Sequence, residues 1–264
     1  MKRLLLPVLF LVAACASAPS PQVSAVAPKG VLRVAVGVGP AASPFWATRD
    51  PATGDARGVT VELGKAAAAK LGVPLKLVEY PNSGEITAAA STDAWDISFM
   101  PQDPAREKFI DPGPAYVLYE SSYIVRAGSD IRNAAEVDRA GIRVGAVEGT
   151  STSRTVAKSL KHASLALFPK AEDAREQLVQ GKVDALAMGR DALVDFARKI
   201  PGTRLLDDII QSTGVVVVVP KDRPATRAWA AQFLEGAKAD GTVRRALDSA
   251  GFTNADVAPP SVLR

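Results

Sequence analysis

The sequence predicts an α/β protein built from two similar units, each a mostly parallel sheet flanked by helices. Apolar residues make up 47% and charged residues 23% of the 264 residues, which is typical of a folded chain with a substantial core. Short apolar runs alternate with segments that carry apolar residues at helical spacing, and this order is typical of βαβ connections. The alternation runs through the first half of the chain and starts again near residue 142.

The first unit alternates three strands with two helices. We expect the strands over residues 31–36, 75–80 and 96–100, and the helices over residues 59–71 and 83–91. The longer helix places Val59, Leu63 and Leu71 on one face, and Gly72 ends it. Ser83 is expected to cap the shorter helix.

The second unit repeats this order, and further elements follow it. We expect its strands over residues 142–147, 165–168 and 183–188, and its helices over residues 153–160 and 171–180. A later strand over 215–219 and two helices over 224–238 and 242–250 complete the chain. Each unit alone satisfies the strand-helix-strand pattern of a parallel sheet.

The N-terminus has the features of a secretory signal. Lys2 and Arg3 precede an apolar run over residues 4–14, and small residues follow. This run is too short to cross a bilayer as a permanent helix. We therefore predict a signal peptide over residues 1–15 and a periplasmic or other extracytoplasmic location for the rest of the chain.

Cys15 is the only cysteine and lies directly after this run. The string Val12–Cys15 resembles the cleavage box of bacterial lipoproteins, in which the cysteine is lipidated. We predict a lipid anchor on Cys15, followed by a Pro/Ala/Ser linker over residues 16–29. The alternative is ordinary cleavage after Ala16 or Ala18, because both end small-x-small patterns.

Composition excludes several function classes. The net charge is +4, but acidic and basic residues are mixed along the chain, so no basic tract for a nucleic-acid backbone is present. His162 is the only histidine, which leaves no basis for Ser–His or Cys–His catalysis or for a zinc site. We expect no metal and no other cofactor.

Seven short motifs occur in a fixed order between Gly30 and Phe252. They are residues 30–36, Pro44-Phe45, residues 58–63, Arg106 with 110–111 and 115–116, residues 149–151, residues 181–185 and residues 238–242. Together they resemble the motifs of the bacterial extracellular solute-binding proteins of family 3, the amino-acid type of ABC-importer binding protein.

The resemblance implies the type II periplasmic binding protein fold, with two lobes joined by two hinge strands. The first lobe would comprise residues 30–120 and 213–264, and the second residues 121–212. Such lobes close around a ligand. The implied function is binding of a small carboxylate-bearing solute, an amino acid or a related organic acid, by a monomer that delivers it to a membrane permease.

The resemblance also implies an anion site between the lobes. Arg106 would grip the ligand carboxylate, since a guanidinium matches a carboxylate with two parallel hydrogen bonds. Thr150, Ser151 and Thr152 lie where a strand ends and a helix begins, and free backbone N–H groups there attract an anion. The alternatives are a surface Arg106 paired with a nearby acid and hydroxyls that only cap the helix.

Phe45 and Trp46 follow the first strand, at the mouth of the implied cleft. Aromatic side chains at such a position stack on a ligand or cover a cation. The alternative is that both pack against their own lobe.

The chain departs from the family where the ligand ammonium is usually bound. Gly189 stands where many members carry an acid, and Arg190 follows it. Gly39 and Ala42 likewise stand where some members carry an acidic and an aromatic residue. An ammonium without a partner in a closed cleft is costly.

Three hypotheses address this departure. Glu120, in a hinge strand, replaces the missing acid; or Arg106 and Arg190 together bind an organic acid without an amine; or Glu120 and Arg190 pair with each other. Two other function classes are alternatives. One is an enzyme resembling cyclohexadienyl or arogenate dehydratase on the same fold, with Glu120 as its acid or base. The other is a ligand-sensing domain. We expect a binding protein and no enzyme.

Overall fold

The computed structural model describes residues 20–38 and 43–261. The predicted signal peptide, the lipidation site Cys15, and Gly39 and Ala42 lie outside these residues. The helices are α1 (Pro21–Val26), α2 (Val59–Leu71), α3 (Ser83–Ala88), α4 (Ala134–Val137), α5 (Ser151–Ser159), α6 (Ala171–Val179), α7 (Arg190–Lys199), α8 (Pro224–Ala239) and α9 (Thr242–Ser249). The strands are β1 (Leu32–Gly37), β2 (Thr48–Arg49), β3 (Ala56–Arg57), β4 (Leu75–Tyr80), β5 (Ile97–Pro101), β6 (Ile110–Arg126), β7 (Arg143–Val147), β8 (Ser164–Phe168), β9 (Ala185–Gly189), β10 (Thr203–Leu205) and β11 (Gln211–Pro220).

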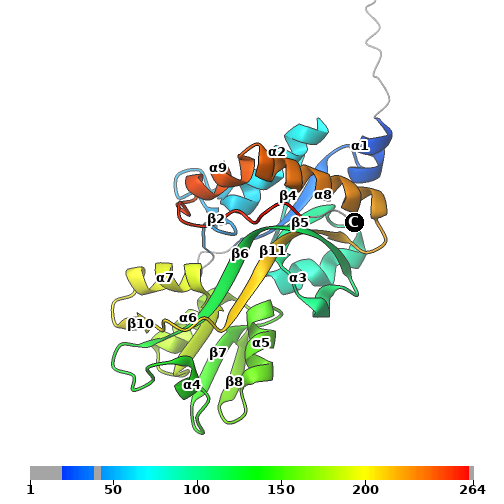
Figure 1. The fold of residues 1–264 in the computed structure, drawn as a ribbon. Helices are drawn as coiled ribbons and strands as arrows, with labels where there is room; N and C mark the ends of the chain where they lie inside the picture. Colours follow the sequence, from blue (N-terminus) through cyan, green and yellow to red (C-terminus); the bar gives the residue numbers. More distant parts are fainter. Residues whose placement is uncertain (1–19, 39–42, 262–264) are drawn as a thin grey trace, which may run out of the picture.

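Two groups of parallel strands are joined by two long antiparallel ones (Figure 1). The sheet order is β4-β1-β5-β11-β6-β9-β7-β8, with β10 on β6. β1 pairs in parallel with β4 and β5, and β7 pairs in parallel with β8 and β9. β6 and β11 are antiparallel to each other and run from one half of the molecule to the other. They are the two hinge strands.

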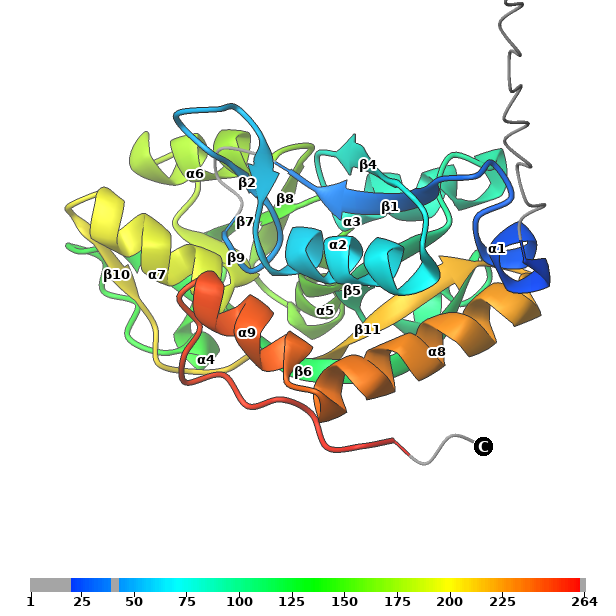
Figure 2. The ribbon, with the colours of Figure 1, turned by 90° about the horizontal axis from the view of Figure 1, so that it is seen from above.

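The buried apolar side chains fall into two groups that define the lobes. One group comes from residues 23–119 and 215–257, and includes Trp95 and Leu234. The other comes from residues 123–210, and includes Val144 and Leu186. We call these parts the first lobe and the second lobe. Each lobe buries both faces of its sheet, and Figure 2 shows α2, α8 and α9 covering one side of the first lobe.

Most predicted elements are found. The strands β1, β4, β5, β7, β8 and β9, and the helices α2, α5, α6, α8 and α9, each lie within two residues of the predicted range. α7 was missed, and Asn82 rather than Ser83 caps α3: the Asn82 side chain accepts hydrogen bonds from the amides of Gly84 and Glu85. The Ser83 hydroxyl is therefore available for another contact.

The predicted linker over residues 16–29 is wrong in its second half. Pro21–Val26 form α1, with Ser20 as the N-cap. Val26 and Ala27 are fully buried, and the Thr226 hydroxyl of α8 donates to the carbonyl of Ala25. Ser followed by Pro is common both at helix starts and in linkers. In this chain, packing against α8 favours the helix.

Across residues 20–38 and 43–261, no helix combines the length and apolar character needed to span a membrane.

Candidate ligand-binding cleft

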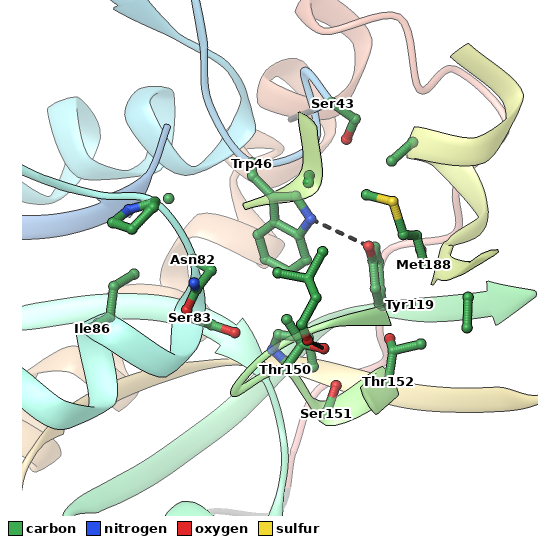
Figure 3. A pocket seen from close by; sticks show the side chains of 18 of the residues that line it. Ser43, Trp46, Asn82, Ser83, Ile86, Tyr119, Thr150, Ser151, Thr152 and Met188 are labelled. Carbon is green, nitrogen blue, oxygen red and sulfur yellow. Dashed lines mark hydrogen bonds between the residues drawn. The ribbon is translucent and has the colours of Figure 1, made fainter. Parts of the chain in front are cut away.

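A cavity of about 120 Å³ lies between the lobes beside the hinge strands (Figure 3). Its size suits a small solute, because it holds only a few water-sized volumes. The first lobe contributes Ser43, Trp46, Asn82 and Ser83 among others, the second lobe contributes Thr150, Ser151, Thr152 and Met188, and Tyr119 of β6 lies between them.

All three predicted residues at the start of α5 line this cavity. The Thr150 hydroxyl accepts from the Ser153 amide at 3.1 Å and donates to the Val147 carbonyl, so it caps the helix. The Thr152 hydroxyl is hydrogen-bonded to that of Ser121 in β6 at 2.8 Å. The Ser151 hydroxyl has no hydrogen-bond partner among the described residues.

The first backbone amides of α5 complete this end of the cavity. The amide of Arg154 makes the first intrahelical bond, to the carbonyl of Thr150. The amides of Ser151 and Thr152 come before it in the chain, and the first amides of a helix have no hydrogen-bond partner within that helix. Two amides and one hydroxyl are thus available for an anion at the positive end of the helix dipole.

Arg106 is buried at the same end of the cavity. Its Nη2 donates to the Ser83 hydroxyl at 2.8 Å and, across the lobe boundary, to the Gly149 carbonyl at 3.2 Å. Its Nη1 lies 3.5 Å from the Pro101 carbonyl, and its Nε has no hydrogen-bond partner among the described residues. The side chain therefore faces the turn before α5.

The electrostatic environment of Arg106 is unusual. Burial, with a smaller contribution from nearby Arg154, lowers the pKa of Arg106 to about 10, so the group still carries its charge at neutral pH. The alternative of a surface arginine paired with Asp103 is wrong, because Asp103 forms its ion pair with Arg154. Arg106 is a buried cation whose direct hydrogen-bond partners are all neutral.

Several contacts join the two lobes around the cavity. The Arg154 Nε donates to Asp103 Oδ2 at 2.7 Å, and the Asn82 side chain donates to the Pro169 carbonyl at 3.0 Å. Gly84 and Gly149 meet backbone to backbone: a Cβ on Gly149 would lie 2.9 Å from the Cα of Gly84. The lobes are therefore in a closed arrangement.

Of the two predicted aromatic residues, only Trp46 lines the cavity. Its Nε1 donates to the Tyr119 hydroxyl at 3.3 Å, and the two rings are 5.0 Å apart, edge to face. Phe45 is 3% exposed and packs between Trp46 and Phe252 in the first-lobe core. The prediction that Phe45 contacts the ligand is contradicted, and the alternative of packing holds for it.

The hypotheses for Glu120 and Arg190 are also contradicted. Successive strand residues face opposite sides, and Tyr119 and Ser121 face inward, so Glu120 is exposed. Arg190 donates to the carbonyls of Leu206 and Asp207, at 3.2 and 3.4 Å, and does not line the cavity. The dehydratase alternative thereby loses the acid on which it depended.

Asp191, which the sequence reasoning missed, lies next to the lining residues Gly189 and Ala192 but does not line the cavity itself. It lies in the first turn of α7, and its Oδ2 accepts a hydrogen bond from the Ser43 hydroxyl of the first lobe. The carboxyl also accepts hydrogen bonds from the Tyr119 hydroxyl and from the backbone amides of Asp191 and Ala192. Burial raises the pKa of this carboxyl, while the bond from Ser43 opposes the shift. An acid two residues after the end of a strand, in a helix start, was the available signal.

The comparisons with known proteins bear on the family and the fold of the chain. The family description "Bacterial extracellular solute-binding proteins, family 3" matches residues 34–250. A curated relative, the glutamine-binding protein of Geobacillus stearothermophilus, is 25% identical over 175 residues, which are 62% of this chain and 64% of the relative. The match thus spans less than two thirds of that relative's length.

Solved structures of the same fold cover most of the chain. Holo ArgBP from T. maritima superposes with a TM-score of 0.72 and 25% identity over 80% of this chain and 92% of that one. The ancestral amino acid-binding protein AncCDT-1, described as a precursor of cyclohexadienyl dehydratase, gives 0.74 and 23% over 84% and 96%. These likenesses confirm the predicted two-lobed fold. The chain belongs to the bacterial extracellular solute-binding proteins of family 3.

Proposed function

We propose that the protein is the extracytoplasmic substrate-binding component of an ABC importer, and that its lobes close on a small solute through the solute's carboxylate. The observation that carries this proposal is the buried Arg106 guanidinium beside the free amides of α5. Arg106 belongs to the first lobe and α5 to the second. A single anion can therefore contact both groups only when the lobes are closed.

The difference between open and closed forms supplies the mechanism. A ligand shifts a conformational equilibrium only by its differential affinity for the two forms. In the open form Arg106 or the α5 start holds the carboxylate alone; in the closed form both hold it. Carboxylate oxygens would then replace the neutral oxygens of Ser83 and Gly149 as acceptors, with charge-assisted bonds. The closed form would dock on the permease.

Calorimetric titration of Arg106 variants tests this proposal. A thermal-shift screen of amino acids and organic acids first identifies a binder, since a ligand of the folded state raises the melting temperature. Arg106→Ala should then weaken its affinity by roughly 1.5–3 kcal/mol, the value of a charged hydrogen bond. Arg190→Ala, which removes a guanidinium outside the cavity, is the control and should change little. Equal affinities for wild type and Arg106→Ala would reject the assignment.

We also infer that the protein binds its ligand without converting it. With Glu120 exposed, no sequence-predicted acid lies in the cleft. Incubation of the purified protein with prephenate or arogenate checks this, and product formation above the buffer blank would contradict it.

Export and anchoring are proposed from residues outside the described part of the chain. Lys2, Arg3 and the apolar run favour a signal peptide, and Val12–Cys15 favour a lipid anchor on Cys15. Cys15→Ser should release the protein from the membrane fraction into the soluble one. Mass spectrometry that shows a mature chain beginning directly after Ala16 or Ala18 would contradict a lipid anchor on Cys15.

A further inference from the structure

The lining of the cavity changes from polar to apolar away from the start of α5. Ile86 of α3 and Phe99 of β5 line it from the first lobe, and Val147 of β7 and Met188 of β9 line it from the second. Each of these side chains is at most 9% exposed. Figure 3 shows Ile86 and Met188 on opposite sides of the pocket. Hydrocarbon and thioether groups therefore enclose the part of the cavity that lies away from the start of α5.

The polar side chains that line the cavity are occupied by bonds within the protein. The Asn82 side chain caps α3 and donates to the Pro169 carbonyl at 3.0 Å. The Tyr119 hydroxyl accepts from Trp46 and donates to Asp191. The two threonine hydroxyls at the start of α5 are likewise bonded within the protein. A polar group on the ligand chain would lose its bonds to water, because the walls away from α5 offer it no free side-chain partner.

The cavity also offers no acid to a cationic ligand chain. Among the described residues, no carboxylate, ammonium or guanidinium group lines it. The residues outside the described parts of the chain contain no aspartate or glutamate. Of the nearby acids, Asp103 is paired with Arg154, and Asp191 lies beside the cavity with hydroxyl and amide donors around it. A cationic chain would therefore be buried without an acidic partner, which is costly.

The volume of the cavity limits the length of the ligand. An apolar cavity of about 150 Å³ in another protein holds benzene, and the volume here is about 120 Å³. The carboxylate of the ligand takes one end of this space. The room that is left suits a short aliphatic chain.

We propose that the cleft selects a carboxylate that carries a short, uncharged aliphatic chain, and that Ile86 and Met188 determine this specificity. This rests on the proposed function, because it takes the carboxylate to lie at Arg106 and the start of α5. Ile86 belongs to the first lobe and Met188 to the second, so an aliphatic chain contacts both only in the closed form. Burial of the chain thereby adds to the closing of the lobes. The substrate class is a small apolar amino acid or the corresponding acid without an amine.

Pairs of ligands with the same shape test this inference. L-valine and L-threonine differ by a methyl and a hydroxyl group, and L-norvaline and L-2,4-diaminobutanoate differ by a methyl and an ammonium group. The pairs without an α-amine are 3-methylbutanoate with 3-hydroxybutanoate, and pentanoate with 4-aminobutanoate. Calorimetry with the wild-type protein should show that the methyl member binds roughly ten- to a hundred-fold more tightly. We expect this preference in the amino-acid series, in the amine-free series or in both.

Variants of Met188 locate the preference in the cleft. Met188→Gln, of similar length, places an amide in the wall and should reduce the preference for methyl over hydroxyl about three- to ten-fold. Met188→Leu keeps the wall apolar and should retain the preference. The control is Leu167→Gln, because Leu167 is 48% exposed on β8 and does not line the cavity; it should also retain the preference. The measured quantity is a ratio of affinities for one variant, so partial unfolding of that variant cancels.

Three results would overturn the inference. One is that the hydroxyl member of a pair binds as tightly as the methyl member. Another is that the ammonium member does so, which would show that the rings of Trp46 and Tyr119 attract a cation. The third is that Met188→Gln leaves the preference unchanged. Failure of the proposed function is a different result: no member of any pair binds, or Arg106→Ala leaves binding unchanged, and the inference then falls with it.

Discussion

Two aspartates, the buried Asp96 in the first lobe and the half-buried Asp191 beside the cleft, have opposite surroundings. Asp96 is 0% exposed and accepts from the Arg33 amide, Nε and Nη2 and from Arg223 Nη1, at distances of 2.7 to 3.0 Å. Asp191 accepts side-chain hydrogen bonds only from the neutral hydroxyls of Ser43 and Tyr119, and it forms no ion pair among the described residues. Asp96 ties β1 and β5 to the start of α8.

The difference separates a carboxylate that is paired with cations from one that has only neutral hydrogen-bond donors. A buried carboxylate with two guanidinium partners is complete, so its removal harms the fold. A buried carboxylate without a cation is a local cost to stability, and such costs concentrate at functional sites. Substitution of Asp96 and of Asp191 is therefore expected to change the stability of the fold in opposite directions.

Asp96→Asn should have the largest effect on stability. It leaves the buried Arg33 and the partly buried Arg223 without a carboxylate, so the free energy of unfolding should fall by about 3–5 kcal/mol. Urea denaturation measures this. Asp93→Asn, which removes an exposed partner of the same Arg33, should cost less than about 1 kcal/mol. A loss at Asp96 no larger than that at Asp93 would break the comparison.

Gly149→Ala should change the surroundings of Asp191 and leave those of Asp96 unchanged, because it interferes with closure of the lobes. Asp191 is enclosed by a contact between lobes, whereas Asp96 lies within one lobe. A Cβ at Gly149 meets Gly84 and blocks closing, so ligand affinity should fall by about 2 kcal/mol while the Asp96 network is untouched. Calorimetry and ligand-dependent small-angle scattering measure this.

Gly202→Ala is the matched control for that variant. Gly202 also has a positive φ, of 88°, but nothing lies within 4 Å of its Cβ position. Both variants carry the backbone strain, and only Gly149→Ala carries the clash. Equal affinities of the two variants would show that the glycine contact does not control closure.

Asp191→Asn should have the smallest and opposite effect, a gain in stability at neutral pH of about 1 kcal/mol in the absence of ligand. Burial holds the pKa of Asp191 above its ordinary 3.8 in the folded state, so the protonated form is favoured there. The stability this group contributes is present at low pH and is lost as pH rises through the raised pKa. Arg175 and Tyr119 also face this site. The gain over wild type should therefore vanish in urea titrations near pH 3 and be largest above neutral pH; a gain independent of pH would contradict this account.

The sequence predicted what is decided locally. The strand periodicity and the start of a helix after Gly149-Thr150 were found where they were predicted, since each is carried by a few consecutive residues. The structure brings Arg106 close to this helix start, and their role in ligand binding stays a prediction. The predicted placement of Glu120 in the cleft was wrong, because a shift of one residue along a strand moves a side chain to the other face of the sheet. Only the register with β9 and β11 decides which face Glu120 occupies. Phe45 and Trp46 are adjacent in sequence, but tertiary packing buries Phe45 in the first-lobe core and leaves only Trp46 at the cavity.

Asp191 could not be predicted from sequence for a different reason. Its partner Ser43 is 148 positions away, and its enclosure exists only when two lobes meet. The helix that carries it begins at Arg190 with no side-chain cap, so the acid in its first turn was the one local signal of its start. Long-range pairing, rather than composition, places it beside the cleft.

A crystal structure of the protein with its tightest-binding solute tests the central claim most directly. We predict closed lobes with the solute carboxylate within hydrogen-bond distance of the Arg106 guanidinium and of the Ser151 and Thr152 amides. A solute bound with its carboxylate turned toward Ser43, or with Arg106 still donating only to Ser83, Gly149 and Pro101, would contradict it.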